Sequence, residues 1–197
     1  MSGALALGFA SPVRDAQAAF RAVLAAMAEP GRIVTPAAPA APPSPLPAAM
    51  AAVALTLVDA DTPLWLDAAA RAGEAPSWLR FHCGCRIVAD PAEAAFAFCT
   101  ESAAMPPMHC FAAGTDEYPD GGATLVVAVR ALGEGPALAL SGPGIAGTTS
   151  LRVAGLPPGF VADRAANHRL FPRGVDTILI AGGMLAALPR STAVAEG

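Results

Sequence analysis

Residues that could do chemistry gather in the stretch RFHCGCRIVAD, Arg80 to Asp90, where one histidine, two cysteines and two arginines fall within seven residues. His82, Cys83 and Cys85, with a second His-Cys pair at 109–110, could in principle supply zinc ligands. Structural zinc sites usually take their thiolates from Cys-x2-4-Cys, whereas only one residue separates these cysteines. The spacing therefore favours small buried cysteines beside a histidine held by a hydrogen bond, and we expect no metal site and no disulfide.

Arg80 and His82 are the second feature of this stretch. If the segment is extended, alternation points both side chains to the face opposite Phe81 and Cys83. A guanidinium beside an imidazole can hold a phosphate oxygen or a partner's carboxylate. The alternative is a buried pair that satisfies a local backbone carbonyl.

The turn GPGIAG, residues 142–147, fits the pattern G-x-G-x-x-G after a predicted strand, with Gly142 and Gly144 as its first two glycines. Such a pattern can bind a dinucleotide. However, Pro143 removes a backbone N–H from the turn, and the following TTSLRV is typical of a strand where a helix is required. The context argues against a Rossmann site and leaves open a tight turn beside another site.

The segments FPRGVD and LPRST place Arg173, Asp176 and Arg190 at opposite ends of a predicted hairpin. Arginine suits phosphate or carboxylate, so these residues could form an anion site. A surface ion pair with a solvated arginine is the alternative. Neither a Ser/His/Asp order nor an H-E-x-x-H pattern is present, so the sequence gives no support to nucleophilic or zinc-protease chemistry.

Charge and composition exclude several functions. The net charge is −4 without a basic block, so we expect no nucleic-acid partner. All 12 basic residues are arginines, which excludes a lysine Schiff base and the lysine of a Walker loop. With 54% apolar and 14% charged residues, the composition favours a protein that covers apolar surface with partners.

Neither a membrane span nor a signal peptide is predicted. The longest strongly apolar run, Ala48 to Val58, is too short to cross a bilayer. The N-terminal GALALGFA has no preceding basic residue, unlike a signal peptide. We therefore expect a cytoplasmic protein without a membrane partner.

The elements that must position these residues follow from periodicity and turn residues. Ser11 and Pro12 predict the cap and start of a helix that ends near Glu29, and its apolar residues form one stripe: Ala16, Phe20, Val23, Leu24 and Met27. The proline-rich stretch 36–47 predicts an extended surface connection. Further helices are predicted at 48–58 and 158–170.

Short apolar runs predict the strands. They cover 64–66, 94–99, 124–129, 137–140 and 150–155, with a closing hairpin at 176–180 and 184–188. Two of them, 94–99 and 124–129, are continuously apolar, as expected of inner strands covered on both faces. The predicted fold is a single α/β domain over 1–197, a mixed β-sheet flanked by helices.

Seven segments in order resemble the PhnH family, a subunit of the carbon–phosphorus lyase of bacterial phosphonate breakdown. They are PVRDAQAAFRAVLAAMAEPG (12–31), LTLVDADTPLWL (55–66), WLRFHCG (78–84), GTDEYPDGGATLVVAV (114–129), LSGPGI (140–145), FPRGVDTIL (171–179) and LPRST (188–192). The resemblance covers nearly the whole chain.

The resemblance implies a fold similar to the large domain of pyridoxal-phosphate-dependent transferases without that cofactor, consistent with the missing lysine. It implies a homodimer that joins other core subunits. The complex uses ATP and an alkylphosphonate, exchanging adenine for the phosphonate at the ribose 1-position, and the isolated chain is expected to hold no cofactor and to be inactive. A separate radical iron–sulfur subunit then cleaves the carbon–phosphorus bond.

The family motifs assign candidate residues for a ligand or a subunit contact. They are Arg80, His82, Asp59, Asp61, Gly142, Gly144, Asp176 and Arg190. Cys83 stands where the family has threonine, and Arg173 where it has an apolar residue, so neither is expected to be essential. The competing hypothesis is a stand-alone nucleotide-binding enzyme that uses the turn at 142–147.

Overall fold

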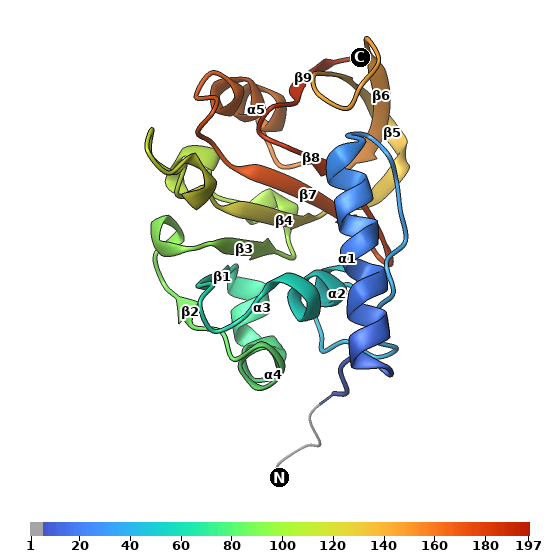
Figure 1. Ribbon diagram of the computed structural model, residues 1–197, viewed down its shortest axis with the longest axis vertical. Coiled ribbons are helices and arrows are strands. Elements are labelled where there is room, and N and C mark those ends of the chain that lie inside the picture. Colours follow the sequence, from blue (N-terminus) through green and yellow to red (C-terminus); the bar gives the residue numbers. More distant parts are fainter. Residues whose placement is uncertain (1–5) are drawn as a thin grey trace.

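Two β-sheets share one apolar core in the computed structural model, which describes residues 6–197 (Figure 1). The larger sheet has six strands in the order β2-β1-β3-β4-β7-β8, and the smaller has three in the order β6-β5-β9. In the larger sheet only β8 is antiparallel to its neighbour. The strands are β1 Leu64–Leu66, β2 Ile87–Val88, β3 Phe96–Cys99, β4 Thr124–Ala128, β5 Ala131–Ser141, β6 Thr149–Ala154, β7 Asp176–Ala181, β8 Met184–Leu188 and β9 Ala193–Glu196.

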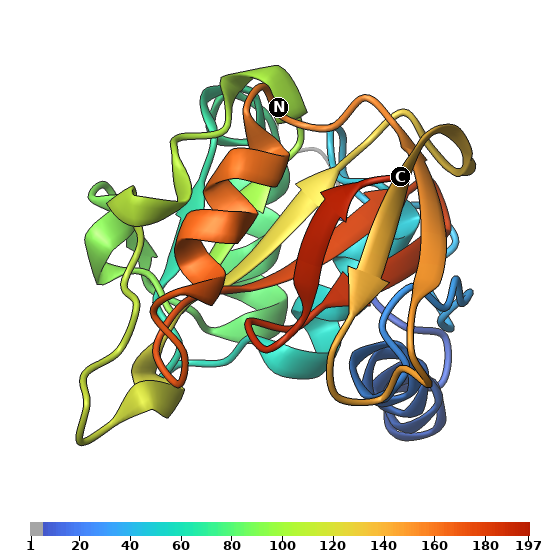
Figure 2. The same cartoon turned by 90° about the horizontal axis from the view of Figure 1, so that it is seen from above.

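Helices cover one face of the larger sheet, and the smaller sheet with one helix covers the other (Figures 1 and 2). The helices are α1 Pro12–Ala28, α2 Ala48–Leu57, α3 Ala68–Ala72, α4 Ala75–Cys83 and α5 Phe160–His168. Buried side chains from α1 to α4 meet one face, and Phe160 of α5 meets the other. An α/β domain with a mixed sheet flanked by helices is thus confirmed, but the separate three-stranded sheet and β9 were not predicted.

The inner strands are buried on both faces, as their continuous apolar runs predicted. Leu64 and Phe98 belong to the core beneath the helices, whereas Trp65 and Ala97 belong to the core shared with the smaller sheet. This division follows from the alternation of side chains along a strand. β1, β3, β4 and β7 therefore form the rigid centre of the molecule.

The predicted helix at 12–29 is confirmed, but its apolar stripe is divided. α1 buries Ala19, Val23 and Ala26, whereas Phe20 and Leu24 are exposed. The predicted cap is also wrong in its chemistry: the Ser11 side chain makes no capping bond, and its backbone N–H instead donates to a carboxylate oxygen of Asp15 at 2.8 Å. Phe20 and Leu24, the outward-facing half of the stripe, are therefore not packed in the core of the domain.

The opening stretch RFHCGC is helical rather than extended. Its first four residues, 80–83, form the last part of α4, which has Pro76 in its first turn and ends where Gly84 adopts the left-handed conformation with φ +68°. Arg80, His82 and Cys83 therefore do not alternate between two faces of a strand. The prediction that Arg80 and His82 point the same way because the chain is extended is wrong.

The proline-rich stretch 36–47 forms neither helix nor strand, as predicted. It runs from the bridge between Val34 and Leu185, beside β8, to the start of α2. Within residues 6–197, no helix combines the length and the apolar character that crossing a membrane requires.

Candidate functional site

The eight residues singled out from the sequence do not form one site. They lie in three places: Asp59, Asp61, Arg80 and His82 around the end of α4; Gly142 and Gly144 between β5 and β6; Asp176 and Arg190 between β7 and β8. Each place has a different chemistry.

His82 holds the segment that precedes α1. Its Nε2 lies 3.0 Å from the backbone oxygen of Ala6, and the indole N–H of Trp78 donates to the same oxygen at 2.8 Å. Since a carbonyl oxygen only accepts, Nε2 is the protonated nitrogen of this bond. A Cβ on Gly8 would come within 3.1 Å of the His82 ring. His82 thus satisfies a backbone carbonyl, but one distant in the sequence and without Arg80, unlike the buried pair on a local carbonyl that was the alternative.

The side chain of Arg80, unlike that of His82, has no hydrogen-bond partner within residues 6–197. Its exposed guanidinium makes no hydrogen bond or ion pair with residues 6–197. The nearby loop is organised by Asp59, whose carboxylate accepts the N–H of Asp61 at 3.0 Å and the hydroxyl of Thr62 at 3.0 Å. A Cβ on Gly84 would lie 4.0 Å from Ala60, so this loop borders the end of α4. Arg80 is the candidate here with an unused charge.

The cysteines of this stretch are buried thiols. Burial raises the pKa of Cys83 to about 12, with smaller contributions from Cys85 and Asp59. Burial also raises the pKa of Cys85. Both thiols therefore stay protonated at neutral pH and are poor ligands and nucleophiles. Across residues 6–197 no three His, Cys, Asp or Glu side chains group closely enough to hold a metal, and the absence of bound metal stays a prediction.

The glycine-rich turn joins two antiparallel strands, β5 and β6, so no helix follows it. A Cβ on Gly144 would lie 2.1 Å from the backbone oxygen of Ala28, and one on Gly142 2.8 Å from that of Ser191. Gly144 thus allows the turn to touch the carbonyl end of α1, which carries partial negative charge and repels phosphate. These contacts give the glycines a packing role and leave the nucleotide-binding hypothesis without structural support.

Asp176 and Arg190 form a half-buried ion pair at the start of β7 and the end of β8. Arg190 Nη2 lies 2.6 Å from one carboxylate oxygen of Asp176, and the Arg190 backbone N–H donates to the other at 2.7 Å. Arg190 Nη1 also donates to the backbone oxygen of Pro119. All of this hydrogen bonding is internal, so the pair holds the hairpin to the 119–121 turn. Arg173, as predicted, stands apart, paired with exposed Asp116.

Sequence reasoning missed a fully buried arginine beside this pair. Arg164 of α5 donates through Nη1 to the backbone oxygen of Val175 at 3.3 Å, and through Nη2 to those of Pro189 at 2.6 Å and Thr192 at 3.1 Å. Burial lowers the pKa of Arg164 to about 10, and the charge of Asp176 opposes this effect. No periodicity reveals this role, because Arg164 stands in a short polar helix. We call Arg164, Asp176 and Arg190 the C-terminal lock.

Ligands of open parallel sheets usually bind at the carboxyl ends of the strands, where the chain changes winding direction. In the larger sheet the chain passes from β1 to its neighbour β2 in one direction, and from β3 to its neighbour β4 in the other. The point therefore lies between the adjacent strands β1 and β3. Asp67 follows β1 and is only 2% exposed. Its carboxylate accepts the backbone N–H groups of Ala70 at 2.9 Å, Thr100 at 2.6 Å and Glu101 at 2.9 Å.

Successive backbone N–H groups of this kind are a common anion cradle. Here the chain's own carboxylate fills the cradle. Polar residues directly after two predicted strands were the available sequence signal for Asp67 and Thr100. Burial, and secondarily the charge of Asp67, raises the pKa of the adjoining Cys99 to about 12. The backbone N–H groups at the position where this architecture usually binds a ligand are therefore already occupied by Asp67.

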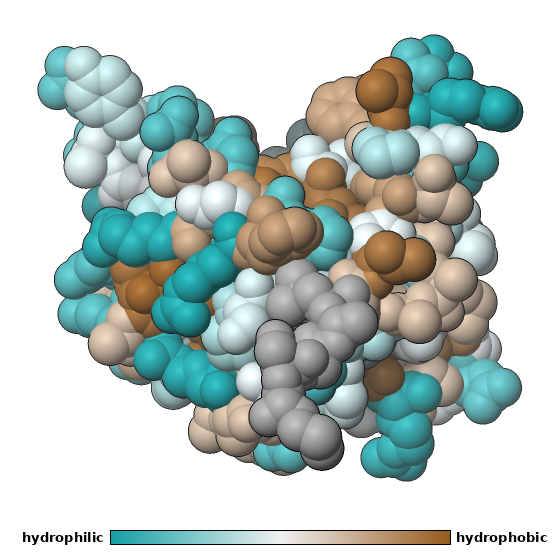
Figure 3. Space-filling view, turned by 90° about the horizontal axis from the view of Figure 1, so that it is seen from below, coloured by the Kyte–Doolittle hydropathy of each residue, from teal (hydrophilic) through white to brown (hydrophobic). Residues whose placement is uncertain are grey.

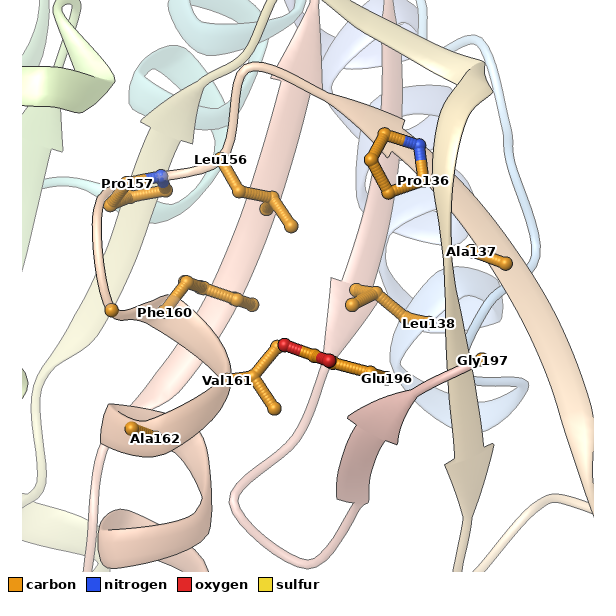
Figure 4. A pocket seen from close by; sticks show the side chains of 11 residues that line it. Pro136, Ala137, Leu138, Leu156, Pro157, Phe160, Val161, Ala162, Glu196 and Gly197 are labelled. Carbon is orange, nitrogen blue, oxygen red and sulfur yellow. The ribbon is translucent and has the colours of Figure 1, made fainter.

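A hollow of about 620 Å³ lies between α5 and the smaller sheet. Leu138, Leu156 and Phe160 line it, and Glu196 extends from β9 toward Val161 (Figure 4). Its walls are mainly apolar, with one carboxylate at the rim. On the face seen from below, apolar residues interrupt the polar ones and two projections flank a depression (Figure 3). These features suit contact with other molecules better than acid–base chemistry.

Comparison with known proteins gives a consistent result. Residues 7–195 match the family described as bacterial phosphonate metabolism protein (PhnH). The chain is 46% identical over 187 residues to the alpha-D-ribose 1-methylphosphonate 5-triphosphate synthase subunit PhnH of Rhizobium meliloti (strain 1021), covering 93% of this chain and 92% of that protein. It is 47% identical over 79 residues, 40% of each chain, to a Stutzerimonas stutzeri protein that carries the name C-P lyase subunit protein HtxG.

Proposed function

The chain belongs to the PhnH family of bacterial phosphonate metabolism proteins, and we infer from this that it is a subunit of the carbon–phosphorus lyase system of phosphonate catabolism. The observation that carries this inference is the 46% identity to a synthase subunit across 93% of the chain. The family match over residues 7–195 spans both sheets and the helices α1 to α5.

The specific role is support for the formation of α-D-ribose 1-alkylphosphonate 5-triphosphate. In this proposal ATP and the alkylphosphonate are substrates of the assembled complex, and the chain itself holds no cofactor. Two features support a subunit that does not act alone. Asp67 fills the usual ligand position with hydrogen bonds to backbone N–H groups, and Asp176 and Arg190 bind each other.

The isolated chain is a cytoplasmic homodimer in this proposal, because its low charge leaves apolar surface to be covered and two-fold pairing is the commonest way to cover it. The likeness of its larger sheet to the large domain of pyridoxal-phosphate-dependent transferases belongs to the same proposal. Light scattering at micromolar concentration tests the dimer, and a monomer would contradict it. Structural superposition tests the likeness.

Complementation tests the function directly. A Rhizobium meliloti strain that lacks its own PhnH subunit should fail to grow with methylphosphonate as the sole phosphorus source and should recover when this chain is expressed. Growth on inorganic phosphate is the control for viability. No recovery despite soluble expression would contradict the proposal.

Turnover by the purified chain separates the two hypotheses from the sequence. ATP and methylphosphonate should release adenine when the other subunits are present, and none with this chain alone. Adenine release by the isolated chain would favour the stand-alone enzyme instead.

A further inference from the structure

The outward face of α1 carries large apolar side chains that the domain does not use. Val13 is 84% exposed, Phe20 48% and Leu24 55%, whereas the residues that α1 buries are Ala19, Val23 and Ala26. At 100° per residue, Val13, Phe20 and Leu24 fall within one narrow stripe. α1 also lies at a corner of the molecule, with one side away from every other element (Figures 1 and 2).

Two arginines run beside this stripe. Arg14 and Arg21 are seven residues apart on the same exposed side of α1, and neither forms an ion pair with residues 6–197. The nearest acidic residue of the helix, Asp15, accepts the N–H of Ser11. The outer face of α1 therefore combines an apolar row with a row of positive charge that no carboxylate neutralises. We call this face, made of Val13, Arg14, Gln17, Phe20, Arg21 and Leu24, the α1 face.

We propose that the α1 face is the docking surface for a different subunit of the complex, one that presents an apolar groove bordered by carboxylates. The proposal rests on the function inferred above, since it requires a multi-subunit assembly. The apolar row supplies the buried centre of such a contact, and the arginines supply its charged border. Arginine is suited to both parts because its stem packs on apolar surface while its guanidinium pairs with carboxylate.

A second copy of this chain does not fit the same requirement. Two α1 faces packed antiparallel across a two-fold axis would place both arginine rows on the same side, where their charges repel. Packed in parallel, the faces would still offer no carboxylate to Arg14 or Arg21, because the α1 face contains none. Charge complementarity thus selects an acidic partner that is another protein, and the homodimer uses a different surface.

The absence of lysine makes a selective test possible. In Gln17→Lys the new side chain stands in the middle of the α1 face and is the sole lysine of the chain. A carbodiimide, which joins an amine to a carboxylate at direct contact, should then link this position to an Asp or Glu of another subunit in the assembled complex. Arg152→Lys is the matched control. It places the sole lysine of that variant at an exposed position of β6 and should give no such link.

Disruption is the complementary test. Phe20→Glu/Leu24→Glu and Arg14→Glu/Arg21→Glu should each lower the amount of this chain retained on the complex by about tenfold or more. The matched controls are Phe171→Glu, an exposed phenylalanine elsewhere, and Arg152→Glu/Arg169→Glu, two exposed arginines without ion pairs. Melting temperatures and the mass of each isolated variant should equal those of the wild type.

Each outcome decides the proposal. A link from position 17 to another subunit, with retention lost only in the α1 variants, supports it. A link to a second copy, or a halved mass of the isolated α1 variants, would overturn it in favour of self-association. Full retention of the α1 variants without any link would also overturn it. Failure of the wild-type chain to join the complex would instead contradict the inferred function.

Discussion

The C-terminal lock and the α1 face use the same residue type in opposite ways. In the lock, Arg164 and Arg190 direct their guanidinium groups at backbone oxygens and at Asp176. On the α1 face, Arg14 and Arg21 have no ion pair within residues 6–197, and apolar residues beside them are exposed. The motif residues Asp176 and Arg190 therefore maintain the fold, whereas the unused bonding capacity of Arg14 and Arg21 marks the surface proposed to meet a partner.

Arg164→Met should produce the largest loss of stability, because it leaves the backbone oxygens of Val175, Pro189 and Thr192 without their donor in the interior. We expect a loss of about 3 kcal/mol or more in the free energy of unfolding, measured by urea titration. Arg169→Met, on the exposed side of the same region, should change it by less than about 0.5 kcal/mol. Equal effects of the two substitutions would break the contrast between engaged and free arginines.

Asp67→Asn should follow in size. The amide keeps one oxygen but turns a donor either toward the backbone N–H groups of Thr100 and Glu101 or toward that of Ala70, which then lose their acceptor. The expected cost is about 2 kcal/mol of unfolding free energy, measured by thermal melting. Asp90→Asn, which accepts a backbone N–H at the surface, serves as the control and should cost much less. An unchanged melting temperature in Asp67→Asn would show that the carboxylate does not hold this cradle.

α4 contains both kinds of residue: His82, which binds a backbone oxygen, and Arg80, whose side chain has no partner within residues 6–197. His82→Ala removes one donor to Ala6, while Trp78 still binds the same oxygen, so we expect a loss of about 1 kcal/mol in thermal melting. Arg80→Ala should leave melting within about 0.5 kcal/mol of the wild type and should lower activity of the assembled complex. Unchanged activity in a folded, assembled Arg80→Ala complex would remove Arg80 from the site.

The thiols should show only a small effect at neutral pH. Cys83→Thr/Cys85→Ala should cost less than about 1.5 kcal/mol, because Cys85 is a small buried residue and Cys83 is only partly buried. Burial raises the pKa of Cys83 from 9.0 to about 12, so its protonated form adds stability in full below pH 9, which is lost as pH rises toward 12. Melting of the wild type should therefore fall more steeply between pH 9 and 11 than melting of the variant. Parallel pH profiles would contradict this assignment.

Most of the secondary structure was predictable because local signals agreed with the fold. Pro12 starts α1, and the apolar runs at 94–99 and 124–129 became the buried strands β3 and β4. α4 was not predicted although Pro76 and Gly84 mark its start and end, because the Trp, Phe, His and Cys of this short helix have weak helix propensity. β9 was missed because its four residues gain their order from β5.

The candidate site was predictable only in part. Arg80 and His82 were found from the family motif, yet their different roles depend on Ala6, more than seventy positions earlier in the sequence. Phe20 and Leu24 have the spacing of a packed stripe, and only the structure shows that α1 buries alanines instead. Which side chains a helix buries, and which distant backbone group a side chain binds, depend on tertiary contacts that local sequence patterns do not contain.

The carboxylate of Asp67 acts as a tethered competitor. Because the backbone fixes it beside the Thr100 and Glu101 N–H groups, its local concentration at the cradle exceeds by orders of magnitude what any dissolved anion reaches in a cell. A dissolved phosphate or phosphonate would have to bind these N–H groups tightly enough to overcome this advantage in local concentration. The backbone N–H groups at this end of the sheet are thus bound by a side chain of the protein itself, which leaves the outer surfaces as the place for contact with other molecules.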